Sequence, residues 1–420
     1  MWLNPLLAVL GAVVTLLRVP ADVRFVLWAE DGNTFLAQAY ERGGANLILE
    51  PYAGYMHLVP RLAAWGVRDL VPFVDSAVGM GVLAAVVTSL TALAAFHWSR
   101  GWLTLPASVL LWLVTLLIPA AALELAINVA DSHWWLMFAA FWALMSRDRG
   151  AVSRVAAVTT VIAAALSDPL TAVLVPLAIV RLIGLRSWKE AIVPVSLFVS
   201  LALQAFVVMG TERGTALERL TLLRLGHQAS LQVGFATVIG GPLGDRIALE
   251  LPALAVGVGV VVLVATFVGS ILVVRRRPLA LIAFVSGAAS FALIQYLVWP
   301  TTRIPADIGP LTWGQRYAFN ALLLVATALV AIADGIVVKG RFPVLGRVVA
   351  GAIAICLLWP GVVQFQSTGY RPDIPGLAEQ MPAAVAACDT HPDAAYPFVT
   401  LPHEAYILLV SCDVVLRSAP

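Results

Sequence analysis

The chain has 420 residues, of which 61% are hydrophobic and only 12% are charged. Soluble globular proteins have about 45 to 50% apolar and about 25% charged residues, so this composition excludes an ordinary soluble domain. The formal net charge of +2 also argues against a nucleic-acid partner, because such binding rests on a concentrated basic surface.

Long apolar stretches between the charged clusters predict membrane-spanning helices. About 20 apolar residues cross the ~30 Å hydrocarbon layer, and a helix satisfies its own backbone hydrogen bonds in lipid. We therefore predict an all-α polytopic transmembrane bundle of about eleven spans. In chain order, the predicted spans cover approximately residues 3–20, 77–96, 102–122, 134–146, 151–166, 169–183, 190–209, 251–274, 278–298, 317–335 and 344–361.

Short basic loops predict the orientation, because Lys and Arg near span ends are retained in the cytoplasm. Counting spans places four such loops on one side, together with His97 to Arg100. The four loops carry Arg147, Arg149 and Arg154; Arg181, Arg186 and Lys189; Arg275, Arg276 and Arg277; and Lys339, Arg341 and Arg347. We expect a plasma-membrane protein with a cytoplasmic N-terminus and an extracytoplasmic C-terminus. The use of Arg for nearly every cation is typical of a GC-rich bacterium.

The first span carries a contrary signal. Arg18 and Arg24 follow it and nothing basic precedes it, which taken alone favours the opposite orientation. A cleaved signal peptide is the other alternative, although a basic start and a clear cleavage site are missing.

Residues 229–240 are apolar but too short for a full span, and counting them as one would move Arg275 to Arg277 outside. We predict a re-entrant or interfacial segment here. Just before it, Leu217, Leu220 and Leu225 interleave with arginines, which is typical of a helix lying in the membrane surface or of an ordinary connecting helix.

The predicted outer loops collect acids, histidines and aromatic residues, which topology does not require. The spans that flank Asp168 are short, so its turn should lie below the outer surface, where a polar group needs a protein-covered or water-filled cavity. Asp131 and His133 precede or begin another short span. With Tyr52 and His57, they predict a polar, substrate-binding cavity that opens to the outer leaflet.

Each of these residues also has a purely structural interpretation. Asp168 stands before a proline, where it would cap a helix start. His133 lies beside two tryptophans and, like Tyr52 and His57, would fit an interfacial aromatic belt.

The adjacent acids Glu30 and Asp31 follow the first span and are candidates for catalysis. Two close carboxylates raise the pKa of one of them, so one could act as a general base. The pair could instead hold a divalent cation such as Mg or Mn, or act as a helix cap in a solvated loop. Metal-binding spacings, phosphate-binding glycine loops and nucleophile elbows are absent from the sequence.

Two arginines in the last outer loop could bind a phosphate. Arg303 lies within the loop, and Arg316 precedes Tyr317 where the chain re-enters the membrane. A guanidinium there could hold a lipid-linked phosphate through paired hydrogen bonds, or simply extend to the interface from a helix end.

This pattern resembles the GT-C superfamily of integral-membrane glycosyltransferases, which take sugars from polyprenyl-phosphate carriers on the non-cytoplasmic face. The resemblance rests on Glu30 and Asp31 in the first outer loop, on about eleven spans with short basic inner loops, and on a late outer loop with Arg and Tyr. It implies that Asp31 is the base that deprotonates an acceptor hydroxyl, with Glu30 as its substitute or electrostatic partner. Arg316 or Arg303 would stabilise the departing phosphate.

The resemblance further implies a polyprenyl-phosphate-linked sugar as donor and a hydroxyl of a cell-envelope glycan, lipid or protein as acceptor. The catalytic loops would be 22–76, 210–250 and 299–316 of a transmembrane domain 1–361. Residues 362–420 would form a small extracytoplasmic segment, in contrast to the large soluble domain of many family members. Because the outside is oxidising, Cys388 and Cys412 predict a disulfide there, with two free thiols as the alternative.

Two other functions compete with this one. A transporter or lipid flippase also uses interrupted helices and buried acids such as Asp168. A non-catalytic partner in a cell-envelope assembly is the third possibility.

Overall fold

The structure is a computed structural model. It describes residues 3–24, 26–43, 45–122, 125, 127–147, 150–184, 188–210, 221–273, 277–302, 311, 314–339, 343–366, 374–401 and 406–418.

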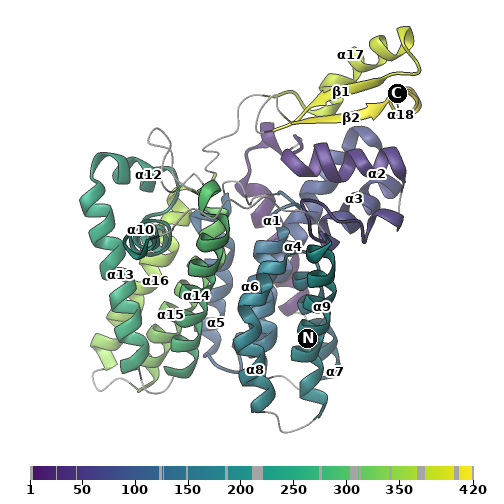
Figure 1. Cartoon of the computed structure of the whole chain (residues 1–420). Helices are drawn as coiled ribbons and strands as arrows, with labels where there is room; N and C mark the ends of the chain where they lie inside the picture. Colours follow the sequence, from purple (N-terminus) through teal and green to yellow (C-terminus); the bar gives the residue numbers. More distant parts are fainter. Residues whose placement is uncertain are drawn as a thin grey trace.

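Each predicted span contains a helix. These helices run side by side along the long direction of the bundle (Figure 1). They are α1 (Leu3–Arg18), α4 (Ser76–Ser99), α5 (Leu105–Leu117), α6 (Ser132–Met145), α7 (Ala151–Ala165), α8 (Val175–Ile183), α9 (Trp188–Met209), α13 (Pro252–Leu272), α14 (Arg277–Thr302), α15 (Arg316–Lys339) and α16 (Pro343–Val363). A 3-10 turn over Pro169–Leu174 leads directly into α8.

Six of the described helical segments are long and apolar enough to cross a membrane. They also expose large apolar side chains on the outside of the bundle, such as Phe206 on α9, Val261 on α13 and Ile355 on α16. A helix surface of this kind is stable against lipid and not against water. The chain is therefore an integral membrane protein, and the number of crossings stays a prediction.

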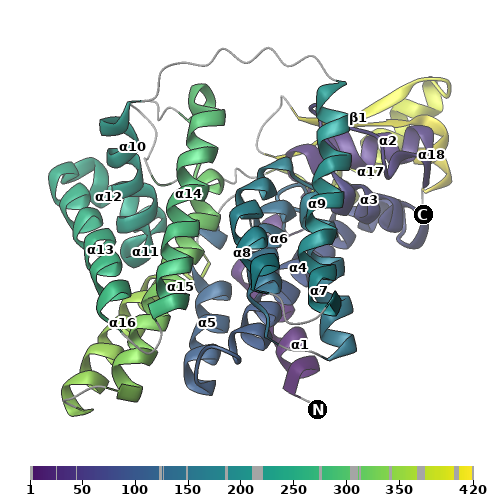
Figure 2. The ribbon, with the colours of Figure 1, turned by 60° about the horizontal axis from the view of Figure 1, so that its bottom comes forward.

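The helices form two groups that meet at α5 and α6. One group contains α1, α4, α6, α7, α8 and α9, and the other contains α13, α14, α15 and α16 (Figure 2). Where the groups meet, α15 contacts both α5 and α6. Trp135 of α6 packs edge-on against Phe319 of α15, with ring centroids 4.6 Å apart.

A cap covers one end of the bundle, which we call the capped end (Figure 1). It contains α2 (Ala37–Arg42) and α3 (Leu58–Leu70) from the first connecting segment. The tail supplies α17 (Leu377–Thr390), β1 (Ala395–Val399), β2 (Ile407–Ser411) and α18 (Cys412–Arg417). Cys388 and Cys412 form a disulfide, and the rings of Phe73 and Phe398 pack 5.2 Å apart between the two parts.

The tail departs from the all-α prediction, because β1 and β2 pair as an antiparallel hairpin with Ala395 opposite Ser411. Along β2 the side chains alternate between exposed and buried, with Leu408 and Val410 directed inward. This period of two is a strand pattern that buries one face. The described residues thus form a mostly helical fold with one two-stranded sheet.

The last turns of α6 and α8 and the first turns of α7, α9, α14 and α16 lie at the opposite end of the bundle, which we call the basic end (Figure 1). Arg147, Arg154, Arg181 and Lys189 therefore share one side, as the span count predicts. Which side faces the cytoplasm stays a prediction.

Arg18 has a structural role that explains its contrary topological signal. Its side chain is 2% exposed and donates hydrogen bonds to the carbonyl oxygens of Leu116 and Ile118, at 3.1 Å for the latter. These carbonyls belong to the C-terminal end of α5, where backbone acceptors lack helical partners. Arg18 thus caps another helix and does not serve as an exposed charge beside the first span.

A helix crosses the bundle near the capped end. It comprises α10 (Leu222–Gln228), a π-helix over Ala229–Phe235 and α11 (Ala236–Ile239), followed by α12 (Gly241–Glu250). Figure 1 shows α10 end-on, whereas α13 to α16 are seen along their lengths. A Cβ atom on Gly234 would lie 2.3 Å from the Gly259 oxygen of α13, so glycines make this crossing possible. This arrangement fits the predicted re-entrant or interfacial segment; Leu217 and Leu220 lie outside the described residues.

Candidate functional site

A cavity of about 650 Å³ lies between the two helix groups at the capped end. It collects eight residues that the sequence singles out: Glu30, Tyr52, His57, Asp131, His133, Asp168, Arg316 and Tyr317. Loop 22–76 and the start of α15 contribute to its wall, whereas the described part of 210–250 does not. Asp31 is absent from the lining, and Arg303 lies outside the described residues.

The side chain of Asp31 is buried, joins two loops through hydrogen bonds and does not line the cavity. Its side chain is 1% exposed, and the backbone N–H groups of Val129 and Ala130 donate to its two carboxylate oxygens at 2.8 and 2.7 Å. Burial raises the pKa of Asp31 to about 7, and the charge of Glu30 adds to this shift, while the two hydrogen bonds oppose it. Asp31 thus ties the first loop to the loop before α6.

Glu30 is the member of the acidic pair that lines the cavity. The residue before it, Ala29, has a φ of 36°, a left-handed conformation that costs energy for a residue with a Cβ atom. The tail holds this conformation, because the Ala29 N–H donates to the Leu401 oxygen at 2.5 Å and the Leu401 N–H donates to Leu27 at 2.8 Å. The side chain of Glu30 therefore lines the cavity, whereas that of Asp31 contacts the loop before α6.

A tight turn presents aromatic rings to the cavity. The backbone N–H groups of Tyr52 and Tyr55 donate to each other's oxygens at 2.9 and 3.1 Å, and Ala53 and Gly54 between them have φ values of 49° and 84°. Two positive φ angles define a type I′ turn. The ring of Tyr55 stacks on His57 with centroids 4.1 Å apart, and Tyr52 meets His57 edge-on at 5.4 Å.

The strained backbone is concentrated around this cavity. Among the described residues, the non-glycine residues with positive φ are Ala29, Ala53 and Ile127. Ala29 precedes Glu30, Ala53 lines the cavity, and Ile127 begins the loop that Asp31 holds. Strain of this kind costs about 1 to 3 kcal/mol per residue and gathers where a function requires a fixed geometry.

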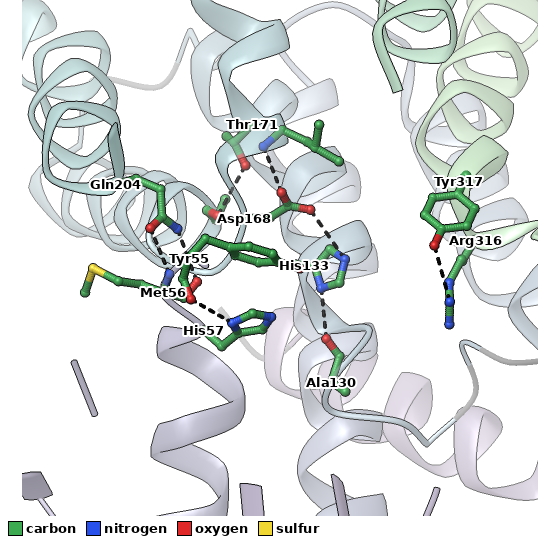
Figure 3. A network of polar contacts seen from close by, with 12 residues as sticks. Tyr55, Met56, His57, Ala130, His133, Asp168, Thr171, Gln204, Arg316 and Tyr317 are labelled. Atoms are coloured by element: carbon green, nitrogen blue, oxygen red, sulfur yellow. Dashed lines mark hydrogen bonds and ion pairs between the residues drawn. The ribbon is translucent and has the colours of Figure 1, made fainter. Parts of the chain in front are cut away.

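His133 and Asp168 form a pair in the wall of the cavity (Figure 3). His133 Nδ1 lies 2.8 Å from the Ala130 oxygen, which can only accept, so Nδ1 carries a hydrogen. His133 Nε2 lies 3.4 Å from Asp168 Oδ2. An attractive contact there requires one more proton, carried by Nε2 or by the carboxyl group. The imidazole of His133 and the carboxyl group of Asp168 therefore face each other in the wall of the cavity.

Asp168 caps a helix start, as its structural interpretation predicts, and it also lines the cavity. Its Oδ1 accepts a hydrogen bond of 2.7 Å from the Leu170 N–H, which caps the 3-10 turn before α8. Its Oδ2 faces His133 and the cavity. In the loop before His133, Asn128 Nδ2 donates a hydrogen bond to Asp131 Oδ2 at 2.8 Å.

Gln204 is a positioning residue that the sequence analysis missed. It lies on α9 and is fully buried. Its Oε1 accepts from the Met56 N–H at 2.9 Å and its Nε2 donates to the Met56 oxygen at 3.1 Å (Figure 3). A lone glutamine inside an apolar span was the available signal, because a polar side chain in lipid needs a partner.

Arg316 supplies a positive charge to the cavity wall from the first residue of α15. Its Nη2 donates to the Tyr317 hydroxyl at 3.3 Å, and its guanidinium lies 5.1 Å from the ring centroid of Tyr317. Tyr317 in turn packs edge-on against Trp134 of α6. A planar cation held in this way suits a phosphate.

A divalent cation held by Glu30 and Asp31 stays a prediction. Both oxygens of Asp31 accept backbone hydrogen bonds, and only Glu30 faces the cavity. Within the described part of the chain, no group of three or more His, Cys, Asp and Glu side chains is placed to hold a metal ion.

Comparisons with known proteins give one solved structure of interest. No family model and no curated protein matches the sequence. The chain is similar to the crystal structure of the Archaeoglobus fulgidus oligosaccharyltransferase in complex with Zn and sulfate, at 14% sequence identity and a TM-score of 0.46. The match covers 92% of this chain, which spans 56% of the length of that protein.

Proposed function

We propose that the chain is a GT-C-type membrane glycosyltransferase that moves a sugar from a polyprenyl-phosphate carrier to an acceptor hydroxyl on the non-cytoplasmic face. One observation carries the proposal: a carboxylate of the first connecting loop, Glu30, and a guanidinium at the start of α15, Arg316, line the same cavity. The two groups come from segments far apart in the sequence. They supply the base and the phosphate site that such a transfer requires.

In this mechanism Glu30 takes the role of base that the resemblance gives to Asp31. The acceptor hydroxyl gives its proton to the Glu30 carboxylate as its oxygen bonds to the anomeric carbon. The bond between that carbon and the phosphate oxygen breaks, and the polyprenyl phosphate leaves as an anion. Arg316 stabilises the charge that develops on the phosphate. Asp31 acts as a positioning residue through its hydrogen bonds to Val129 and Ala130.

An apolar groove supports a lipid-linked donor. It has a volume of about 360 Å³ and lies between α10, α13, α14 and α15. Ala321 and Val325 line it, one and two turns along α15 from Tyr317 in the cavity wall. We propose that the phosphate binds at Arg316 and the isoprenoid chain follows α15 into this groove.

The test is sugar transfer in proteoliposomes by Glu30→Gln, with a panel of polyprenyl-phosphate-linked hexoses and pentoses as donors. Loss of the base should reduce transfer by about 10²-fold or more, while binding of polyprenyl phosphate stays unchanged because Arg316 is intact. The control is Glu50→Gln, which removes an acid of the same loop that pairs with Arg42 at 2.8 Å away from the cavity lining. Normal transfer by Glu30→Gln would disprove the proposed role.

A transporter is the second candidate, and the contact between His133 and Asp168 favours it, because a paired imidazole and carboxyl group in a membrane-embedded cavity can carry a proton. The same proteoliposomes separate the two functions. If Glu30→Gln transfers sugar normally and Asp168→Asn abolishes pH-driven uptake of substrate into the proteoliposomes, the chain is a transporter and not the proposed enzyme.

A further inference from the structure

A second cavity lies at the basic end, between α6, α7, α8 and α9. Its volume is about 560 Å³. The described side chains that line it include four cations and one carboxylate: Arg147, Arg154, Arg181, Lys189 and Glu190. The sugar-transfer mechanism uses none of them, and the cavity of Glu30 lies at the other end of the bundle.

Two of these cations are held in place by neighbouring groups. Arg181 donates from Nη1 to the carbonyl oxygens of Leu144 and Ser146 at 2.8 and 2.6 Å, at the C-terminal end of α6. The guanidinium of Arg147 lies 3.3 Å from the ring centroid of Trp102. Trp102 is itself fixed, because its indole N–H donates to the Met145 oxygen at 2.7 Å. The positive charge of this cavity is therefore preorganised, as a site for an anion requires.

Exposed apolar side chains lie one or two residues from the lining cations along the same helices. Val152 is 85% exposed, Ile183 is 81% exposed and Trp188 is 73% exposed, and they belong to the same turns of α7, α8 and α9 as the cations. In a membrane these side chains face acyl chains, and a tryptophan at this level is typical of the interface. A soluble anion would interact only with the cations, whereas a phospholipid would contact the cations with its phosphate and these apolar side chains with its acyl chains.

We propose that this cavity binds the phosphate head group of an anionic phospholipid whose acyl chains lie along α7, α8 and α9. A basic pocket between transmembrane helices is the kind of site that such head groups occupy. The proposal requires a membrane-embedded chain but not the glycosyltransferase activity. Its partner is a lipid of the surrounding leaflet rather than the donor lipid at the capped end.

The test is titration of the detergent-solubilised full chain with short-chain phosphatidylglycerol, followed by microscale thermophoresis. Arg154→Gln/Lys189→Gln should raise the Kd about 25-fold, since each cation near a lipid surface contributes about fivefold. The matched control is Arg347→Gln, an exposed cation at the basic end that does not line the cavity; its Kd should not change. If the double variant fails to fold, Lys189→Gln replaces it, because this change alters only an exposed side chain. It should raise the Kd about fivefold.

Two further arms identify the ligand. Phosphatidylcholine of the same chain length should bind at least tenfold more weakly, and millimolar inorganic phosphate should not displace phosphatidylglycerol. Equal binding of the neutral lipid, displacement by phosphate alone, or an equal loss in Arg347→Gln would each overturn the proposal.

Discussion

Glu30 and Asp31 are adjacent in the sequence, but Glu30 lines the cavity and Asp31 is buried behind it. Their sequence position identifies an acidic motif, but not which of the two faces the substrate. The direction of each side chain depends on the positive φ of Ala29 and on the carboxylate contacts to Val129 and Ala130. These contacts come from segments about 100 residues away along the chain, so the local sequence does not show which of the two acids lines the cavity.

The buried Asp31 should make stability depend on pH. Its folded-state pKa is about 7, above the ordinary value of 3.8, so the folded state favours the protonated form. This contribution is fully present below about pH 4 and is lost as the pH rises through about 7, for a total on the order of 4 kcal/mol. We expect the apparent Tm in detergent to fall between pH 5 and pH 8, and Asp31→Asn to reduce that fall.

The control for this prediction is Glu50→Gln, which changes an exposed acid and should leave the slope of Tm against pH as it is. An unchanged slope in Asp31→Asn would show that another group causes the dependence.

The helices differ in how well their sequence predicts them. Spans such as α13 and α15 are long and apolar, and lipid alone requires them to be helical, so their positions follow from composition. Helices α2 and α3 lie in the cap and bury only one face, so they lack the long apolar run that predicts a span. The crossing helix over residues 222–239 depends on the contact between Gly234 and Gly259, which no local pattern indicates.

Helix α9 should control the order of the aromatic turn through Gln204. Gln204→Leu leaves the N–H and the oxygen of Met56 without their side-chain partners, at a cost of about 1 to 3 kcal/mol. We expect hydrogen exchange at the Met56 amide to become at least tenfold faster. Ser196→Ala is the control, because its hydroxyl bonds only to Val193 within the same helix. Unchanged hydrogen exchange at the Met56 amide would show that Gln204 does not position the aromatic turn.

At the level of the whole molecule, the cavity depends on the tail as well as on the bundle. The hydrophobic cluster of the cap contains residues of the first loop and of the tail, and the main chain of Leu401 bonds to Leu27 and Ala29. The sequence predicted the disulfide of the tail. It did not indicate this docking, because the two partners are more than 370 residues apart.

Removal of the disulfide should therefore loosen the acidic motif. Cys388 and Cys412 close a loop whose constraint is worth about 3 kcal/mol in the unfolded state. In Cys388→Ser/Cys412→Ser we expect faster hydrogen exchange at Leu401 and Ala29 and a partial loss of transfer. Cys356→Ser, on the outside of α16, should change neither. Fast exchange confined to α17 and α18 would mean that the bridge stabilises only the tail.

The contact between Ala29 and Leu401 also has a consequence for biosynthesis. Leu401 follows Glu30 by more than 370 residues, so the turn at Ala29 lacks this contact until the helices of the bundle have been translated. A chain without Leu401 would keep those helices, but the backbone before Glu30 would lose the hydrogen bonds that hold it. The wall of the cavity at Glu30 is therefore completed only when the tail docks.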